Sequence, residues 1–125
     1  MTMLATLRSI IKEVGLAGNL EQALEIIVRR VKATMEVEVC SVYLANEEQQ
    51  RYLLMASDGL NPEAVGMAGL DFGEGLVSLV AERAEAVNLD NAPDHPRFCF
   101  LPGTDEQHYH AFLGAPIIHH RKVLG

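Results

Sequence analysis

Apolar residues at helical spacing mark the first third of the chain. One stripe consists of Leu4, Leu7, Ile11 and Val14, and a second of Leu20, Leu24, Ile27, Val31 and Met35. Side chains that recur every three or four residues line one face of a helix. Asn19 stands at the capping position of the second helix, and Gln22 follows three residues later in the reciprocal position. The pattern therefore predicts two amphipathic helices before residue 37.

After residue 37 the pattern becomes typical of short β-strands. β-branched and aromatic residues occur at 37–44, polar residues at 46–50, and an apolar run resumes at 51–56, which predicts a β-hairpin. Further elements are expected: brief strands at 70–72 and 85–89, a short helix starting near Pro62, and a helix after the glycine turn at 73–75.

A long loop and a second hairpin follow. Residues 90–103 contain three prolines, and loops of this length in compact domains are usually functional or mobile. The elements expected after it are a helix capped by Thr104 and running through Tyr109, a strand at 112–118 that contains Pro116, a polar turn at 119–122 and a returning strand from Val123. This order predicts an α+β fold on an antiparallel sheet, in one domain over residues 1–125.

Composition and charge narrow the class of protein. The 125 residues are 49% hydrophobic and 22% charged, as in an ordinary globular domain. A net charge of −7 repels phosphate backbones and anionic lipid headgroups, so neither nucleic acid nor a membrane is expected as a partner. No signal peptide or long apolar run is present, which indicates a cytosolic protein with Cys40 and Cys99 reduced.

Four segments carry a family resemblance. They are CSVYL at 40–44, FGEGLV at 72–77, NAPDHPRF at 91–98 and FLGAPII at 112–118. Together with the order of elements, they resemble the GAF family over essentially the whole chain. More narrowly, they resemble the GAF domain that precedes the catalytic part of nitrogen-type phosphoenolpyruvate-protein phosphotransferases.

This resemblance implies an arrangement of the fold. The family has a central antiparallel sheet, with the first and last helices packed on one face and a small-molecule pocket on the other. The strand after the 119–122 turn lies inside that sheet and a helix follows it, so we expect the C-terminal strand and helix to be missing from residues 1–125. An isolated chain is then expected to be unstable or prone to strand exchange, because strand edges would lack partners.

The resemblance also implies a regulatory role. Such domains are thought to report nitrogen status and to tune autophosphorylation of a downstream histidine, with glutamine or 2-oxoglutarate as the expected ligand. A homodimer is expected, and a phosphocarrier protein is the expected partner of the full-length enzyme. No cofactor is expected in this chain, and Mg²⁺ only in a downstream catalytic domain.

Two departures limit what the resemblance carries over. The Asn-Lys-x-Phe-Asp-Glu signature of cyclic-nucleotide-binding GAF domains is absent, which disfavours a cyclic nucleotide. No segment resembles the phosphorylated-histidine region of such phosphotransferases, so none of the five histidines is assigned as the phosphoacceptor. We therefore expect no catalytic centre in this chain.

Two neighbouring sets of residues are candidates for ligand binding. The turn at 73–75 can present backbone N–H groups to an anion at the start of a helix, and Arg97 in the long loop can clamp a carboxylate beneath an aromatic lid. The candidate residues are Phe72, Gly73, Glu74, Gly75, Asn88, Asp90, His95, Arg97, Phe98 and Tyr109. The alternative for the turn is a purely structural role; for the loop it is local backbone bonding, a solvated Arg97 and a Phe98 that anchors the loop in the core.

Other functional classes stay open. A zinc site is poorly supported, because the His108–His110 and His119–His120 pairs lack further ligands at suitable spacing. A GAF-type methionine sulfoxide reductase would need Cys40 or Cys99. Cys40 falls in a predicted strand, where a small buried hydrophobe is the commoner role, and Cys99 lies between Phe98 and Phe100 with no obvious cation to activate it. The main alternative to a sensor is a structural dimerisation module, in which the first helix pairs with its counterpart in another subunit.

Overall fold

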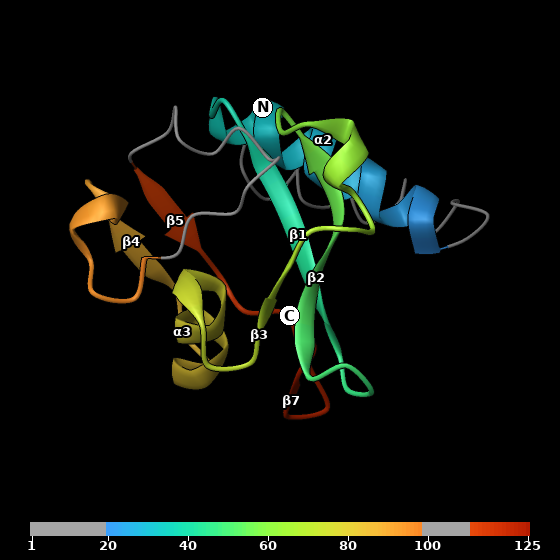
Figure 1. Cartoon of the computed structure of the whole chain (residues 1–125). Helices are drawn as coiled ribbons and strands as arrows, with labels where there is room; N and C mark the ends of the chain where they lie inside the picture. The colour runs from blue at the N-terminus through green and yellow to red at the C-terminus, as the bar shows by residue number, and fades with distance from the viewer. Residues whose placement is uncertain (1–19, 99–110) are drawn as a thin grey trace.

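The computed structural model describes residues 20–98 and 111–125 (Figure 1). Its helices are α2 (Leu20–Met35) and α3 (Gly75–Arg83), with short 3₁₀ helices η1 (Pro62–Ala64) and η2 (Ala92–Asp94). Its strands are β1 (Cys40–Asn46), β2 (Arg51–Asp58), β3 (Gly69–Asp71), β4 (Val87–Leu89), β5 (Phe112–Gly114), β6 (Ile118–His119) and β7 (Lys122–Val123). The predicted first helix, the Asn19 cap and the predicted helix containing Tyr109 lie outside the described residues.

The predicted hairpin is confirmed as β1 and β2, which pair antiparallel with a bulge between Val42 and Tyr43. β3 joins the other edge of β2, where Arg51 pairs with Asp71. The short helix predicted near Pro62 is also confirmed, and the Asn61 side chain accepts a hydrogen bond from the Glu63 N–H at its start. β1, β2 and β3 form the central antiparallel sheet of an α+β fold.

Helix α2 packs on one face of the β1–β2 hairpin (Figure 1). Its buried Leu24 and Val28 contact Val42 and Ala56 of the strands, as the second apolar stripe predicts. Leu54 is only two residues from Ala56, but the bulge shifts the register so that Leu54 pairs with Tyr43, whose side chain points to the face opposite that of Val42. Leu54 therefore lies in a separate cluster, where it is 0% exposed. The hairpin therefore buries apolar side chains on both faces.

A second unit is built around α3. Its buried Leu76, Leu79 and Val80 pack with Val87 of β4 and Ala92 of η2. β4 pairs antiparallel with β5, and Phe112 of β5 packs against this cluster. Figure 1 shows α3, β4 and β5 beside β3, on the side of the central sheet away from α2.

The prediction of one continuous strand over 112–118 is wrong. Two strands occupy that range: β5 pairs with β4, and β6 pairs with β7. Pro116 lies between them and has no N–H to donate to a strand ladder. The polar turn is confirmed, and His120 and Arg121 have φ of 50° and 64°, as a tight primed turn requires.

The returning strand predicted from Val123 is found as β7 and runs back toward the central sheet. The Ala45 N–H of β1 donates to the Leu124 carbonyl oxygen at 2.8 Å. The last residues thus occupy the edge of β1 that β2 leaves open. Within the two described stretches, neither helix is long and apolar enough to cross a membrane.

Candidate ligand-binding site

The Arg97 side chain connects the loop after η2 to two parts of the α3 unit. Its Nη2 donates to the Gly73 carbonyl oxygen at 2.8 Å, and its Nη1 donates to Glu82 Oε2 at 2.9 Å. The contact with Gly73 joins the glycine turn and the long loop, which the sequence analysis treats as two separate sets of candidate residues. Arg97 is thus neither fully solvated nor an unengaged clamp, because two of its five N–H donors already have partners.

The turn before α3 has the backbone that its glycines allow. Gly73 and Gly75 have φ of 90° and 74°, a region that other residues rarely adopt. A Cβ added at Gly73 would meet no atom of the described residues within 4 Å, so this part of the chain leaves the space above Gly73 open. Glu74 occupies the capping position of α3, but its side chain makes no capping hydrogen bond. The exposed approach to the start of α3 therefore runs over Gly73 and Glu74.

The loop is fixed by contacts on both sides of Arg97. The Arg97 N–H donates to His95 Nδ1 at 3.0 Å, and the Phe98 N–H donates to the His95 carbonyl oxygen at 3.0 Å. Phe98 packs against the α3 cluster, which agrees with its anchoring alternative. The Asn91 side chain donates to Asp94 Oδ2 at 2.8 Å, a local contact between side chains and not the side-chain-to-backbone bond of the alternative. His95 and Phe98 hold the loop, and Arg97 is the residue that reaches out of it.

Several of the remaining candidate residues do not lie beside Arg97 and the glycine turn. Asn88 and Asp90 are exposed in and after β4, and among the described residues no hydrogen bond or ion pair joins either of them to the glycine turn. Phe72 is half-buried and packs against Tyr52 of β2, with ring centroids 4.7 Å apart and the ring planes tilted by 50°. Tyr109 lies outside the described residues. The residues brought together are therefore Gly73, His95, Arg97 and Phe98, with Glu74 and Gly75 following in the turn.

Sequence reasoning missed Glu82 and Tyr52. Glu82 is in the last turn of α3, fifteen residues before Arg97, and no local pattern links them. The Tyr52–Phe72 contact had a usable signal, because Tyr52 pairs with Leu70 and Phe72 is the next residue on the same face. Burial raises the pKa of Tyr52, and the carboxylates of Glu82 and Glu47 raise it further.

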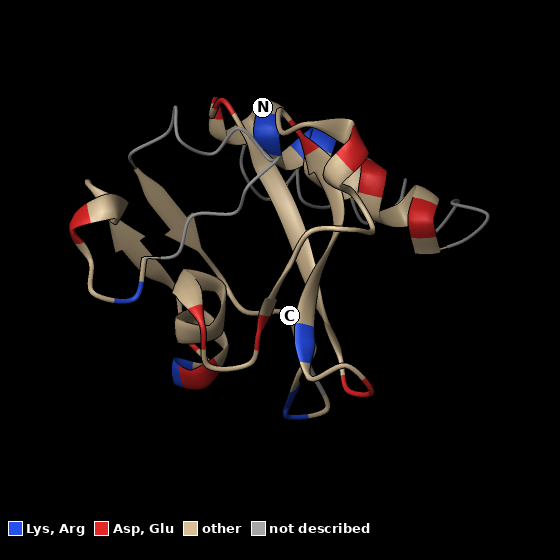
Figure 2. Cartoon of the chain, in the orientation of Figure 1, with Lys and Arg blue, Asp and Glu red and all other residues tan. Residues whose placement is uncertain are grey.

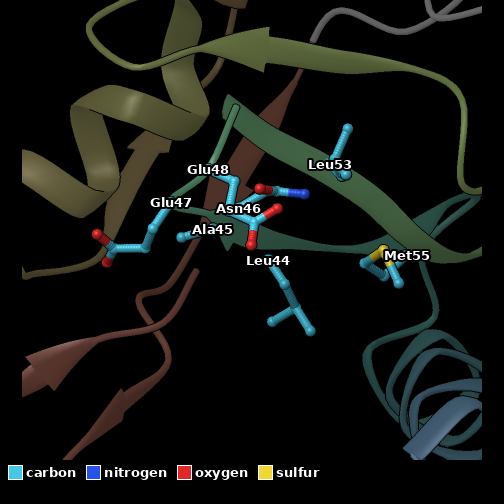
Figure 3. A pocket seen from close by; sticks show the side chains of 7 residues that line it. All are labelled: Leu44, Ala45, Asn46, Glu47, Glu48, Leu53 and Met55. Carbon is cyan, nitrogen blue, oxygen red and sulfur yellow. The ribbon is translucent and has the colours of Figure 1, made fainter. Parts of the chain in front are cut away.

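Two hollows lie elsewhere, on the α2 face of the sheet. One, of about 420 Å³, is lined by the end of the β1–β2 hairpin, including Leu44, Met55, Glu47 and Glu48 (Figure 3). The other, of about 390 Å³, lies between α2 and the C-terminal hairpin and is largely apolar. None of the described candidate residues lines either hollow.

Neither the distribution of charged residues nor the placement of metal-binding side chains points to a further site among the described residues. Figure 2 shows acidic and basic residues interspersed over α2, α3 and the hairpins rather than gathered on one face. Among residues 20–98 and 111–125, no group of three or more His, Cys, Asp or Glu side chains is placed to hold a metal ion. Burial and the nearby Asp58 raise the pKa of the Cys40 thiol, which disfavours the reactive thiolate that a sulfoxide reductase needs.

Comparison with known proteins is consistent with this architecture. The GAF domain model matches residues 19–125. A protein of Salmonella typhimurium described as a phosphoenolpyruvate-dependent phosphotransferase system is 44% identical over 121 residues, which are 97% of this chain and 16% of that protein. The chain thus spans about a sixth of the length of this relative.

Two solved structures are similar over nearly all of the chain. The GAF domain of a phosphoenolpyruvate-protein phosphotransferase from Acinetobacter is 48% identical, with a TM-score of 0.87, and the match covers 100% of this chain and 75% of that one. The corresponding domain from Coxiella burnetii is 45% identical, with a TM-score of 0.90, and the match covers 98% and 73%. This chain therefore belongs to the GAF domain family.

Proposed function

We propose that this domain is the small-molecule-sensing regulatory part of a cytosolic phosphoenolpyruvate-protein phosphotransferase. The support is its similarity to the GAF domains of two such enzymes, at 45% and 48% identity. Catalysis and transfer to a phosphocarrier protein then belong to other parts of the full-length enzyme. The role of this domain is to bind a metabolite and alter how readily the enzyme phosphorylates itself.

The ligand in this proposal is a small carboxylate such as glutamine or 2-oxoglutarate. The observation that carries it is the Arg97–Gly73 contact, which sets a guanidinium beside a glycine turn with open space above it. Guanidinium groups bind carboxylates in a planar, two-pronged geometry. The exposed residues Gly73 and Glu74 also lie at the positive end of α3, which favours negative charge, although the Glu74 N–H itself donates to the Asp71 carbonyl oxygen.

Regulation follows if the ligand prefers one arrangement of the loop. A ligand shifts a two-state equilibrium only by its difference in affinity for the two states. A carboxylate held by both Arg97 and the Gly73 turn would favour the docked arrangement of the loop over an undocked one. In this proposal, the catalytic part of the enzyme changes its rate of autophosphorylation when the loop is docked.

Calorimetry and an enzyme assay together test this function. Glutamine and 2-oxoglutarate are titrated into the full-length enzyme, and its autophosphorylation from radiolabelled phosphoenolpyruvate is measured with and without each compound. We expect binding of one compound and a changed rate, with both lost in Arg97→Ala. If neither compound binds or changes the rate, the proposed ligand class is wrong.

A second function, dimerisation, is favoured by the apolar hollow between α2 and the C-terminal hairpin. Leu20, Ile117 and Leu124 line it, and Leu20 is 62% exposed. An apolar surface of this kind suits contact with another protein subunit. Sedimentation of the chain and of a Leu20→Glu variant tests the idea: a wild-type dimer that the variant dissociates supports it, and a wild-type monomer rejects it.

A further inference from the structure

The Arg97 guanidinium is held by two acceptors of different kinds. The Gly73 carbonyl oxygen belongs to the backbone of the turn, whereas Glu82 Oε2 belongs to a side chain on α3. Only the second is a carboxylate, the same chemical group as in the proposed ligand. An incoming carboxylate that takes the Nη1 N–H now bonded to Glu82 must therefore displace Glu82.

The contact with Glu82 is suited to exchange. The side chains of Arg97 and Glu82 are 31% and 50% exposed, so water can solvate the Glu82 carboxylate as it leaves. Ion pairs this exposed contribute little to stability, because solvent screens them and both side chains lose freedom. The Arg97 backbone, in contrast, is fixed by His95 and by the packing of Phe98. The guanidinium can thus change one partner while the loop stays in place.

From this geometry we infer that Glu82 is a built-in competitor for the ligand. Its carboxylate occupies the edge of the Arg97 guanidinium that a ligand carboxylate would take, and binding exchanges one carboxylate for the other while Arg97 keeps its hydrogen bond to Gly73. The inference rests on the proposed function, since it needs a carboxylate ligand at Arg97. It adds that Glu82, a residue of the domain itself, raises the ligand concentration needed for binding.

The exchange also gives binding a structural effect. Glu82 lies in the last turn of α3, which ends at Arg83 and is followed by Ala84 at a φ of 52° and then by β4. While Glu82 is paired, the loop is tied to the end of α3 as well as to the turn before it. Ligand binding releases the tie at Glu82 and keeps the tie at Gly73, so the two ends of α3 respond differently.

Affinity measurements on matched variants test the inference. Glu82→Gln removes the competing charge, and Glu82→Asp keeps the charge on a side chain one methylene shorter. Glu85→Gln is the control, because it removes the same charge from an exposed position just beyond α3. Each chain is titrated with glutamine and with 2-oxoglutarate by calorimetry at one ionic strength, and circular dichroism confirms that each variant is folded.

We expect both Glu82 variants to bind the ligand about two- to fivefold more tightly than the wild type, the range set by an exposed ion pair, and Glu85→Gln to match the wild type. If the wild type binds but the Glu82 variants bind equally or more weakly, Glu82 is not a competitor, and the proposed function stands. If Glu85→Gln binds the ligand as tightly as the Glu82 variants do, the gain in affinity comes from the lower net negative charge of the chain, and the inference is wrong. If no chain binds either compound, the proposed function itself fails.

Discussion

Arg97 Nη2 and the Gly73 carbonyl oxygen are 2.8 Å apart, although the two residues are 24 positions apart in the sequence. The contact joins the loop after η2 to the turn before α3. Because Phe98 is packed beside α3 as well, the loop, the turn and the helix form one connected unit.

Replacing Arg97 with alanine should lower the free energy of unfolding by about 1–2 kcal/mol. The substitution removes an exposed ion pair, worth about 0.2–1 kcal/mol, and a hydrogen bond to a carbonyl oxygen, worth about 0.5–1.5 kcal/mol. Urea unfolding followed by circular dichroism measures the change. Arg97→Lys is the matched control and should recover part of the loss, since an ammonium group can reach one acceptor. An alanine variant as stable as the wild type would contradict the contacts of Arg97 with Gly73 and Glu82.

Alanine substitutions at Gly73 and Gly59 should lower the free energy of unfolding by different amounts, because the added methyl group has room at Gly73 but not at Gly59. Gly73→Ala should cost about 1 kcal/mol, because the methyl group meets open space and only the positive φ is unfavourable. At Gly59, φ is 116° and the added carbon would lie 2.5 Å from the Glu38 carbonyl oxygen. Gly59→Ala should therefore cost more than about 2 kcal/mol. Denaturant midpoints give the order, and equal costs would show that the turn at Gly59 relaxes freely.

Leu54→Ala should be among the most destabilising single truncations in the described core. The Leu54 side chain is 0% exposed, and truncation of such a leucine costs about 2–5 kcal/mol through lost burial and the cavity left behind. Leu113→Ala is the matched control: this side chain is 56% exposed and should change stability by less than about 1 kcal/mol. Thermal unfolding of the two variants measures the difference, and similar losses would contradict the assigned core.

Cys40 should make stability fall at alkaline pH. Burial, aided by Asp58, raises the pKa of the Cys40 thiol in the folded chain, whereas an unfolded thiol has a pKa of about 8.5. The folded state then holds this proton to higher pH than the unfolded state does. Its stabilising contribution is complete below about pH 8.5 and is lost as pH rises through the folded pKa.

Cys40→Ser isolates this effect. Unfolding free energies measured from about pH 7 to 10 should decline less steeply in the variant than in the wild type, because the titrating thiol is gone. Cys99 is unchanged in both proteins, so the difference belongs to Cys40. Parallel curves would show that the Cys40 thiol is not buried in solution.

Much of the fold was predictable because its signals are local. The α2 stripe, the β1–β2 hairpin, the Asn61–Pro62 helix start and the glycine turn before α3 each depend on residues close in sequence. The single strand expected over 112–118 was not found, because the break at Pro116 depends on β5 and β6 pairing with different strands. The β4–β5 pairing joins residues far apart in the sequence and leaves no local pattern, whereas Pro116 was itself a local signal of the break.

The site was predictable only in part. Glycines at 73–75 and an arginine in a long loop are visible in the sequence, and the structure brings Gly73 and Arg97 together. Glu82 was missed because its role depends on where α3 places it relative to a residue fifteen positions later. Asn88 and Asp90 resemble site residues by type, yet they are exposed in and after β4, and within the described part of the chain neither is hydrogen-bonded to the turn.

The central claim is that a carboxylate metabolite binds at the turn before α3 through Arg97, and an NMR titration of the isotope-labelled chain tests it most directly. Glutamine and 2-oxoglutarate are added in turn, and the shift of each assigned backbone amide is followed. We predict that one compound shifts the amides of Gly73, Glu74, Arg97 and Phe98, saturably and not in Arg97→Ala. Shifts confined to the hollow at Glu47 and Glu48, or no shifts with either compound, would contradict the claim.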